Sequence, residues 1–112
     1  MNTPTPTPKR GPRPGSGTIE RLKPERIQDG LRALTGWRLD ESGTSISRRF
    51  RFPSARPAAS FSQLVADLAL DHLHQPAIHL YGNQVDVTLT TALARGLTAR
   101  DLKLARAINL VP

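Results

Sequence analysis

The first apolar pattern along the chain has helical spacing. Ile27, Leu31 and Leu34 recur every three or four residues, so they fall on one face of a helix. Pro24 can open this helix because the N–H at the first helical position has no intrahelical partner. Gly36 follows the last apolar residue and is typical of a helix end. The pattern therefore predicts a helix from Pro24 to about Leu34.

A longer apolar series with the same spacing predicts a central helix. Ser54 is suited to cap its N-terminus, and the series ends at about Leu73. The expected buried stripe comprises Ala58, Phe61, Val65, Leu68 and His72, backed by Leu64 and Ala69. We expect this stripe to pack against the rest of the domain.

The segment before the central helix alternates between apolar and polar residues, which is the pattern of a half-buried strand. We predict a hairpin of Trp37–Asp40 and Ser45–Phe52, joined by a turn at residues 41–44. In the second strand Ile46, Phe50 and Phe52 share one face, whereas Ser47, Arg49 and Arg51 share the other. Arg48 interrupts the alternation because it falls on the apolar face.

A second hairpin is predicted after the central helix, with strands at Ala77–Tyr81 and Gln84–Thr91. Gly82 and Asn83 join the two strands, and glycine at the first of two turn positions is typical of a type II′ turn. We expect Val85, Val87 and Leu89 to face inward and Asp86, Thr88 and Thr90 to face outward.

The last helix is predicted to open at Thr98. Thr98 and Asp101 stand three residues apart before an apolar run, which approximates a capping box. The expected buried stripe comprises Leu104, Ala105, Ile108 and Val111. The order of elements is α-β-β-α-β-β-α. This order predicts an α+β fold with three helices on one face of a four-stranded antiparallel sheet.

Composition separates an N-terminal segment, residues 1–18, from a domain predicted at residues 19–112. Five of the 10 prolines lie in this segment with Lys9, Arg10 and Arg13, and no acidic residue precedes Glu20. Such a composition cannot bury apolar surface, which predicts an extended and disordered tail. The tail is either a short motif that docks on a negatively charged partner or a tether with no binding role.

Charge and cysteine content narrow the classes of function. The net charge of +7 favours an acidic partner, such as nucleic acid, anionic lipid or an acidic protein surface. Without the tail, 13 basic and 9 acidic residues leave +4, which makes nucleic acid an unfavoured partner. The chain has no cysteine, which excludes disulfides and fits a cytoplasmic protein. No apolar run approaches the roughly 20 residues needed to cross a bilayer.

The candidate chemistry lies in the second half of the chain. The frame consists of His74, Gln75, Pro76, Tyr81, Ala92, Gly96-Leu97-Thr98 and Asp101. It resembles the pterin-4a-carbinolamine dehydratase family, which carries His-His-Pro after its central helix, a third histidine after a later strand, and an aspartate opening its last helix. The likeness extends over about residues 19–110. It implies the same α+β fold.

Gln75 and Ala92 stand where the family carries two of its three histidines. The family's reaction removes water from a 4a-hydroxytetrahydropterin, so one proton must reach the leaving hydroxyl and another must leave a ring nitrogen. Histidine suits both tasks because its ordinary pKa lies near neutrality. Glutamine can hydrogen-bond but cannot titrate, and alanine does neither. The resemblance therefore implies a degenerate site and a protein that is not an enzyme.

The retained residues also have structural interpretations. Asp101 suits the positive end of a helix dipole. His74 fits a hydrogen-bonding residue at a helix-to-strand corner, and Pro76 prevents the preceding helix from continuing. Tyr81 is expected to pack within the strand or core. A metal site of His72, His74 and His79 lacks a suitably spaced carboxylate.

Among such relatives, the chain is most similar to the pterin dehydratase-like RuBisCO assembly factors of α-carboxysomes, which keep the fold without the histidine set. This likeness implies a cytoplasmic chaperone that binds RuBisCO subunits, the large subunit above all, needs no cofactor and is linked to carboxysome assembly. It also implies a homodimer, because the family joins sheets at exposed edges. Arg48, Arg49 and Arg51 are candidate contacts for an acidic partner surface.

Two other functions stay open. An active dehydratase would use His74 and Asp101, with Gln75 as a group that binds substrate. A transcriptional coactivator or nucleic-acid-associated binding module would agree with the coactivator role that the family has in animals.

Overall fold

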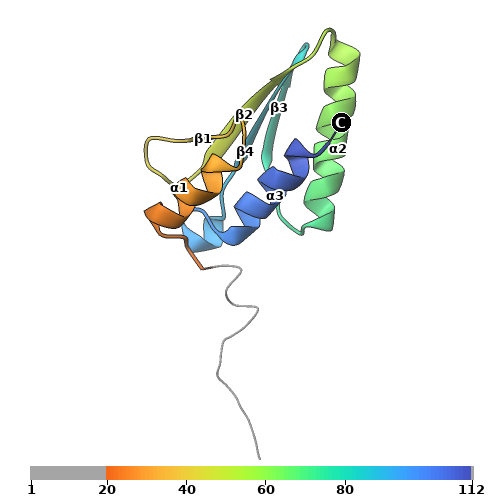
Figure 1. Ribbon diagram of the computed structural model, residues 1–112. Coiled ribbons are helices and arrows are strands. Elements are labelled where there is room, and N and C mark those ends of the chain that lie inside the picture. Colours follow the sequence, from red (N-terminus) through yellow and green to blue (C-terminus); the bar gives the residue numbers. More distant parts are fainter. Residues whose placement is uncertain (1–19, 112) are drawn as a thin grey trace, which may run out of the picture.

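The computed structural model describes residues 20–111, and the tail predicted at residues 1–18 lies outside this range. The described helices are α1 (Pro24–Arg32), α2 (Ala55–Asp71) and α3 (Ala99–Asn109). The described strands are β1 (Arg38–Leu39), β2 (Ile46–Arg51), β3 (Ala77–Tyr81) and β4 (Gln84–Leu89). A short 3-10 helix, η3 (Ala92–Ala94), precedes α3 and was not predicted. Figure 1 shows how these elements are arranged.

The four strands form one antiparallel sheet in the order β1-β2-β4-β3. Both predicted hairpins are present, because β1 pairs with β2 and β3 pairs with β4. The two hairpins meet at β2 and β4, where Ile46 lies opposite Leu89 and Arg51 lies opposite Gln84. This pairing leaves β3 at one edge of the sheet and the two-residue β1 at the other.

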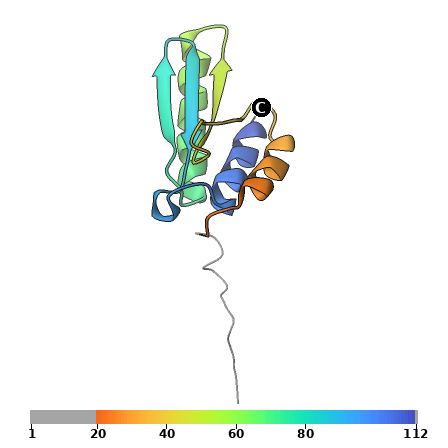
Figure 2. The same ribbon diagram turned by 90° about the vertical axis from the view of Figure 1, so that its left-hand side faces the viewer.

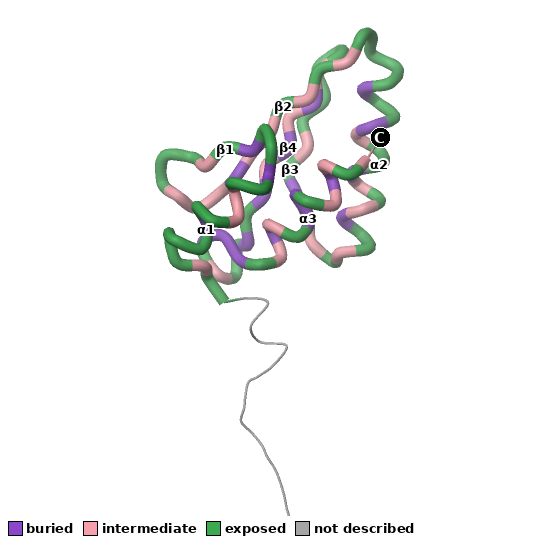
Figure 3. The backbone as a smooth tube through the Cα atoms, viewed as in Figure 1, coloured by how far each residue is buried: buried purple, intermediate pink, exposed green. Residues whose placement is uncertain are grey.

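Alternation along the strands divides the sheet into a buried face and an exposed face. Val85, Val87 and Leu89 are fully buried, as their spacing predicts, and the residues between them point outward. Figure 3 shows buried positions recurring along β4 and on the inner sides of the helices. These positions belong to a single apolar core that all three helices share with the sheet.

All three helices lie on the same side of the sheet. Helix α2 packs against β3, β4 and α3. Helix α1 lies against α3, where a Cβ on Gly30 would stand 2.6 Å from Leu102. Figure 2 views the sheet from its other side, with β2, β4 and β3 in front of α2 and no helix crossing them. The predicted α+β architecture is confirmed.

The two hairpin turns follow from their side chains. Gly82 has φ +53°, whereas Asn83 is not among the residues with positive φ, which agrees with the predicted type II′ turn. In the β1–β2 turn, Asp40 accepts hydrogen bonds from the N–H groups of Thr44 and Ser45 and from the Ser42 hydroxyl. The bond from Ser42 is the main cause that lowers the pKa of Asp40 to about 2.

Two local expectations about the helices and strands were wrong, and a third, the N-cap at Ser54, was confirmed in position only. Leu64 does not back the α2 stripe and is 47% exposed, because consecutive residues are about 100° apart around a helix and Val65 already faces the core. Ser54 occupies the N-cap of α2, but its hydroxyl makes no capping hydrogen bond. The first strand is shorter than predicted. None of the helices described between residues 20 and 111 is long and apolar enough to cross a bilayer.

Candidate functional site

His74 is positioned by the way in which α2 ends. Leu73 adopts a left-handed conformation with φ +52°. The N–H of Leu73 donates to the carbonyl of Leu70 (3.1 Å), and the N–H of His74 donates to the carbonyl of Ala69 (3.0 Å). This pair of bonds is a Schellman motif formed without glycine. It turns the chain back toward β3, with the buried Pro76 following two residues later.

Asp101 is positioned by the N-terminus of α3. The N–H of Thr98 donates to Asp101 Oδ2 (2.9 Å), and the Thr98 hydroxyl accepts from the N–H groups of the first turn. The predicted capping box is therefore confirmed. Asp101 is completely buried, although a capping aspartate normally sits at the protein surface. The burial requires further hydrogen-bond donors, because a buried carboxylate without partners is strongly unfavourable.

Two side chains from other elements supply those donors. The Thr91 hydroxyl, which follows β4, donates to Asp101 Oδ2 (2.7 Å) and lies 2.9 Å from the Thr98 hydroxyl. His74 Nε2 faces Asp101 Oδ1 at hydrogen-bonding distance. A carboxylate can only accept, so the ring nitrogen is the donor. These contacts join the ends of α2 and β4 to the start of α3. We call the four residues the dyad cluster, after the central pair of His74 and Asp101: His74, Thr91, Thr98 and Asp101.

The dyad cluster is closed to solvent. The side chain of His74 is 8% exposed and that of Asp101 is 0% exposed. Each carboxylate oxygen has at least one donor from the protein itself. The predicted hydrogen-bonding role of His74 at the helix-to-strand corner is confirmed, and so is the position of Asp101 at the start of the helix.

The remaining residues of the sequence frame are arranged differently. Gln75 and Ala92 are exposed, and Ala92 begins η3 immediately after Thr91. Tyr81 lies on the sheet face that the helices leave open and is 59% exposed, so of the two expected kinds of packing it shows the one within the strand, against His79, and not the one in the core. The cause is register: Tyr81 lies opposite the outward-facing Gln84, while Leu80 lies opposite the buried Val85.

Large exposed apolar side chains neighbour the frame residues along the chain. Leu70 and Leu73 precede His74 on the α2 terminus, and Leu93 follows Ala92 on η3. Leu73 and Leu93 are 79% and 87% exposed. We call these three residues the leucine rim. Among residues 20–111, no group of three histidine, aspartate or glutamate side chains is arranged to hold a metal ion.

Arg48 takes part in a second polar cluster, at the other end of α3. Its Nη1 donates to the Thr35 carbonyl (2.9 Å) and to Asn109 Oδ1 (2.7 Å), and its guanidinium lies over the Phe50 ring. Asn109 Oδ1 also accepts from Trp37 Nε1 (2.8 Å). We call Arg48, Asn109, Trp37 and the Thr35 carbonyl the arginine cluster. Arg48 is thus half-buried and bonded to the loop after α1 and to α3, whereas Arg49 and Arg51 are exposed.

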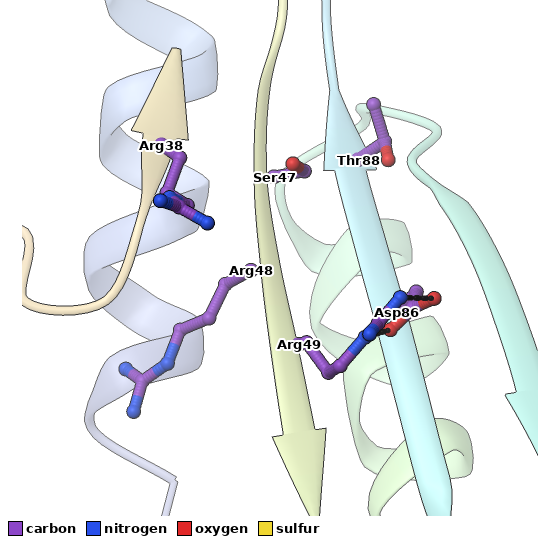
Figure 4. A pocket seen from close by; sticks show the side chains of 6 residues that line it. All are labelled: Arg38, Ser47, Arg48, Arg49, Asp86 and Thr88. Carbon is purple, nitrogen blue, oxygen red and sulfur yellow. Dashed lines mark hydrogen bonds and ion pairs between the residues drawn. The ribbon is translucent and has the colours of Figure 1, made fainter. Parts of the chain in front are cut away.

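Arg49 and Arg51 lie on the open face of the sheet, as predicted. Figure 4 shows Arg49 reaching from β2 to Asp86 on β4, with Ser47 and Thr88 one step along the strands. Arg49 Nε and Nη2 donate to the two oxygens of Asp86 at 2.9 and 3.3 Å. The hydrogen bond and the charge of Asp86 raise the pKa of Arg49.

Sequence reasoning missed Thr91 and Asn109, although each is central to one cluster. Thr91 is the last residue of a predicted strand and carries no motif. Asn109 lies 72 residues from Trp37 and 61 from Arg48. A buried tryptophan signals that its N–H needs a partner, but not which residue provides it.

The fold and the frame together define a class of protein, and comparison with known proteins identifies it. Residues 20–111 match the family model described as pterin 4 alpha carbinolamine dehydratase. The chain belongs to this family.

Individual relatives agree with this assignment. A protein of Rhizorhabdus wittichii is 42% identical over 92 residues, which are 82% of this chain and 95% of the relative. A protein of Gloeobacter violaceus is 36% identical over 92 residues, which are 80% of this chain and 100% of the relative. The first is named "Putative pterin-4-alpha-carbinolamine dehydratase". The second is named "Putative pterin-4-alpha-carbinolamine dehydratase 2".

A solved structure matches the fold as well. The crystal structure of a "transcriptional coactivator/pterin dehydratase" from Brucella melitensis superposes with a TM-score of 0.77 at 36% identity. The match covers 80% of this chain and 96% of that chain. The predicted fold and family are therefore confirmed.

Proposed function

We propose that this chain is a pterin dehydratase-like protein that acts by binding a protein partner and does not catalyse dehydration. The observation that carries the proposal is the state of His74. Its ring is buried and hydrogen-bonded to Asp101, while the exposed positions 75 and 92 hold glutamine and alanine. The frame thus presents no exposed titratable side chain at the positions where the family's histidines stand.

The chemistry of the family's reaction explains why this matters. Loss of one positioned acid or base typically lowers the rate about 10²–10⁴-fold. Two of the three histidines are replaced, and the third donates its Nε2–H to a carboxylate within the protein. Losses within one site need not multiply. We expect the two losses together to leave little advantage over the spontaneous reaction.

The leucine rim supports a binding role. Leu70, Leu73 and Leu93 are large and exposed. Leu73 and Leu93 lie within two residues of His74 and Thr91, which both bond to Asp101, and exposed apolar patches are typical of interaction sites. Such a surface suits a chaperone that covers aggregation-prone surfaces until subunits assemble.

The partner that we propose is RuBisCO, in particular its large subunit, on the strength of the resemblance given above. The protein would then work in the cytoplasm beside carboxysome assembly, without a cofactor. A homodimer is expected, because β3 is an edge strand of five residues with no partner on its outer side in the described part of the chain. Arg49 and Arg51 stay candidate contacts for an acidic surface, whereas Arg48 already serves the fold.

Co-expression with RuBisCO subunits tests this proposal. The wild-type chain should raise the yield of assembled RuBisCO, measured by native gel and carboxylase activity. The double variant Leu70→Ser/Leu93→Ser should lose most of this gain. Leu110→Ser is the matched control, because Leu110 is 76% exposed at the opposite end of α3. An unchanged yield with the wild-type chain would refute the RuBisCO role.

A second function, active dehydration, is favoured by the intact pairing of His74 with Asp101 and by the names of the relatives. Turnover of a 4a-hydroxytetrahydropterin separates the two functions. We expect no rate above the spontaneous reaction. Robust turnover that His74→Ala abolishes would establish a dehydratase and disprove the binding proposal.

Restoring the missing groups sharpens this test. In the double variant Gln75→His/Ala92→His, histidines stand at the two exposed positions of the frame. Appearance of turnover in this variant alone would show that the chain lacks only the titratable side chains. A coactivator role, suggested by the name of the Brucella melitensis protein, would be tested by searching for a bound transcription factor.

A further inference from the structure

The open face of the sheet combines charge with exposed rings in an ordered array. Strand register places its outward side chains in rows. Arg38, Ser47, Thr88 and Ala77 form one row, Arg49, Asp86 and His79 the next, and Arg51, Gln84 and Tyr81 the third. No helix of the described chain covers these rows (Figure 2). The face is therefore available to a partner.

The charge of this face is positive and concentrated. Arg38, Arg49 and Arg51 accompany a single carboxylate, Asp86, which leaves +2 on the three rows. The low charge of the whole domain argued against nucleic acid, but the distribution of the arginines gives a different picture. Association with a polyanion depends on the local potential, to which these three arginines contribute on one face.

The rings distinguish this face from a surface that is merely basic. His79 and Tyr81 are both exposed, and their rings are nearly parallel, with 11° between the planes and 6.2 Å between the centroids. They lie on β3, across β4 from Arg49 and Arg51. An acidic protein surface would use the arginines but would gain little from exposed ring faces. Nucleobases stack on such rings, and phosphates pair with arginine.

We infer that this face binds single-stranded nucleic acid, with bases on His79 and Tyr81 and the phosphate backbone along Arg38, Arg49 and Arg51. An open four-stranded sheet with exposed rings is a known platform for splayed bases. The Ser47 and Thr88 hydroxyls line the same pocket as Arg38 and Arg49 and offer hydrogen bonds to phosphate or sugar oxygens. The site is separate from the dyad cluster and does not depend on the proposed RuBisCO role.

Fluorescence anisotropy with labelled single strands of about 15 uridines or thymidines tests this inference with the full chain. Tyr81→Ala and His79→Ala should each weaken binding about fivefold or more, because a base that stacks on a ring contributes about 1–3 kcal/mol. Tyr81→Phe should bind like the wild type, since it keeps the ring. The exposure of both residues means that the fold should persist, which thermal unfolding can verify.

Salt dependence measures the arginine contacts. Arg38→Ala and Arg51→Ala should each reduce the slope of log affinity against log salt by about 0.7, the value for one phosphate contact on a single strand. Arg56→Ala is the matched control, because Arg56 is an exposed arginine on α2 and should leave the slope unchanged. The basic N-terminal residues are constant in all variants, so differences report the sheet face alone.

Two results would overturn the inference. One is the absence of measurable binding at about 50 mM salt, where such contacts are strongest. The other is wild-type affinity in Tyr81→Ala together with equal competition by polyglutamate. That combination would identify the face as a site for acidic protein surfaces, in which the rings have no part.

Discussion

Each end of α3 is bonded to other elements by a polar cluster. The two clusters have the same structural effect, but only one of them includes residues of the family's frame. At the N-terminus, the dyad cluster holds Asp101 with three donors from three elements. At the C-terminus, the arginine cluster holds Asn109 with donors from Trp37 and Arg48. The first coincides with the family's catalytic frame, and the second does not. Both nevertheless fix the helix to the rest of the fold in the same way.

This likeness shows that His74 and Asp101 have a structural role that does not depend on catalysis. A completely buried carboxylate needs its donors whether or not a substrate ever binds. The burial therefore gives His74 and Asp101 a structural role of their own, whereas Gln75 and Ala92 are exposed and have no such role. The comparison implies that the dyad cluster stabilises the fold more than the arginine cluster does, because its hydrogen bonds are more deeply buried.

The largest effect is expected from Asp101→Ala. The change leaves the N–H of Thr98, the Thr91 hydroxyl and His74 without their acceptor in a site closed to water. Each buried donor left without an acceptor typically costs about 1–3 kcal/mol, so the loss of three acceptor contacts should reach several kcal/mol. Urea unfolding at neutral pH should show this loss in the free energy of unfolding. A loss below about 1 kcal/mol would mean that the cluster is not a structural unit.

A smaller effect is expected from His74→Ala, at about 1–3 kcal/mol, because one buried carboxylate oxygen loses its donor. The double variant His74→Ala/Asp101→Ala should be less destabilised than the sum of the two single variants, since the residues share one interaction. Additive losses would show that the two side chains act independently. Dehydratase turnover measured on the same proteins keeps stability and activity apart.

The arginine cluster provides the matching test at the other end of α3. Asn109→Ala should cost about 2 kcal/mol, because Trp37 is buried and its N–H loses its acceptor. Arg48 remains bonded to the Thr35 carbonyl in this variant, which limits the loss. Equilibrium unfolding by urea gives the value. A greater loss than in Asp101→Ala would reverse the ranking of the two clusters.

The arginine cluster requires glycine at position 36. Gly36 has φ +87°, and a Cβ at this position would stand 2.6 Å from Arg48 Nε. Any other residue would be strained and would also displace the guanidinium. The sequence predicted Gly36 as a helix end, but α1 ends earlier, at Arg32, with Ala33 as its C-cap. The observed role of Gly36, the close approach of Arg48, depends on a contact between distant segments that the local pattern does not contain.

The distinction between local patterns and contacts of distant segments also separates what the sequence could predict from what it could not. Periodicity located α2, β3 and β4 because each buries one face, and the spacing of Thr98 and Asp101 predicted the capping box. The contacts of Thr91 and Asn109 escaped prediction because their partners come from other elements. The left-handed turn at Leu73 also escaped, since glycine is the usual residue at such a position.

The smallest expected effect tests the difference between the two predicted N-caps. Thr98→Ala should cost about 1 kcal/mol, because the Thr98 hydroxyl accepts from the first turn of α3. Ser54→Ala should change stability by less than about 0.5 kcal/mol, since the Ser54 hydroxyl makes no capping bond and is exposed. Thr98→Ser keeps the acceptor and serves as the control for the lost methyl group. Equal losses at Thr98 and Ser54 would mean that both hydroxyls cap their helices in solution. The buried Thr98 cap would then be no stronger than the exposed Ser54 cap. In that case the contribution of the dyad cluster to stability would come from the contacts of Asp101.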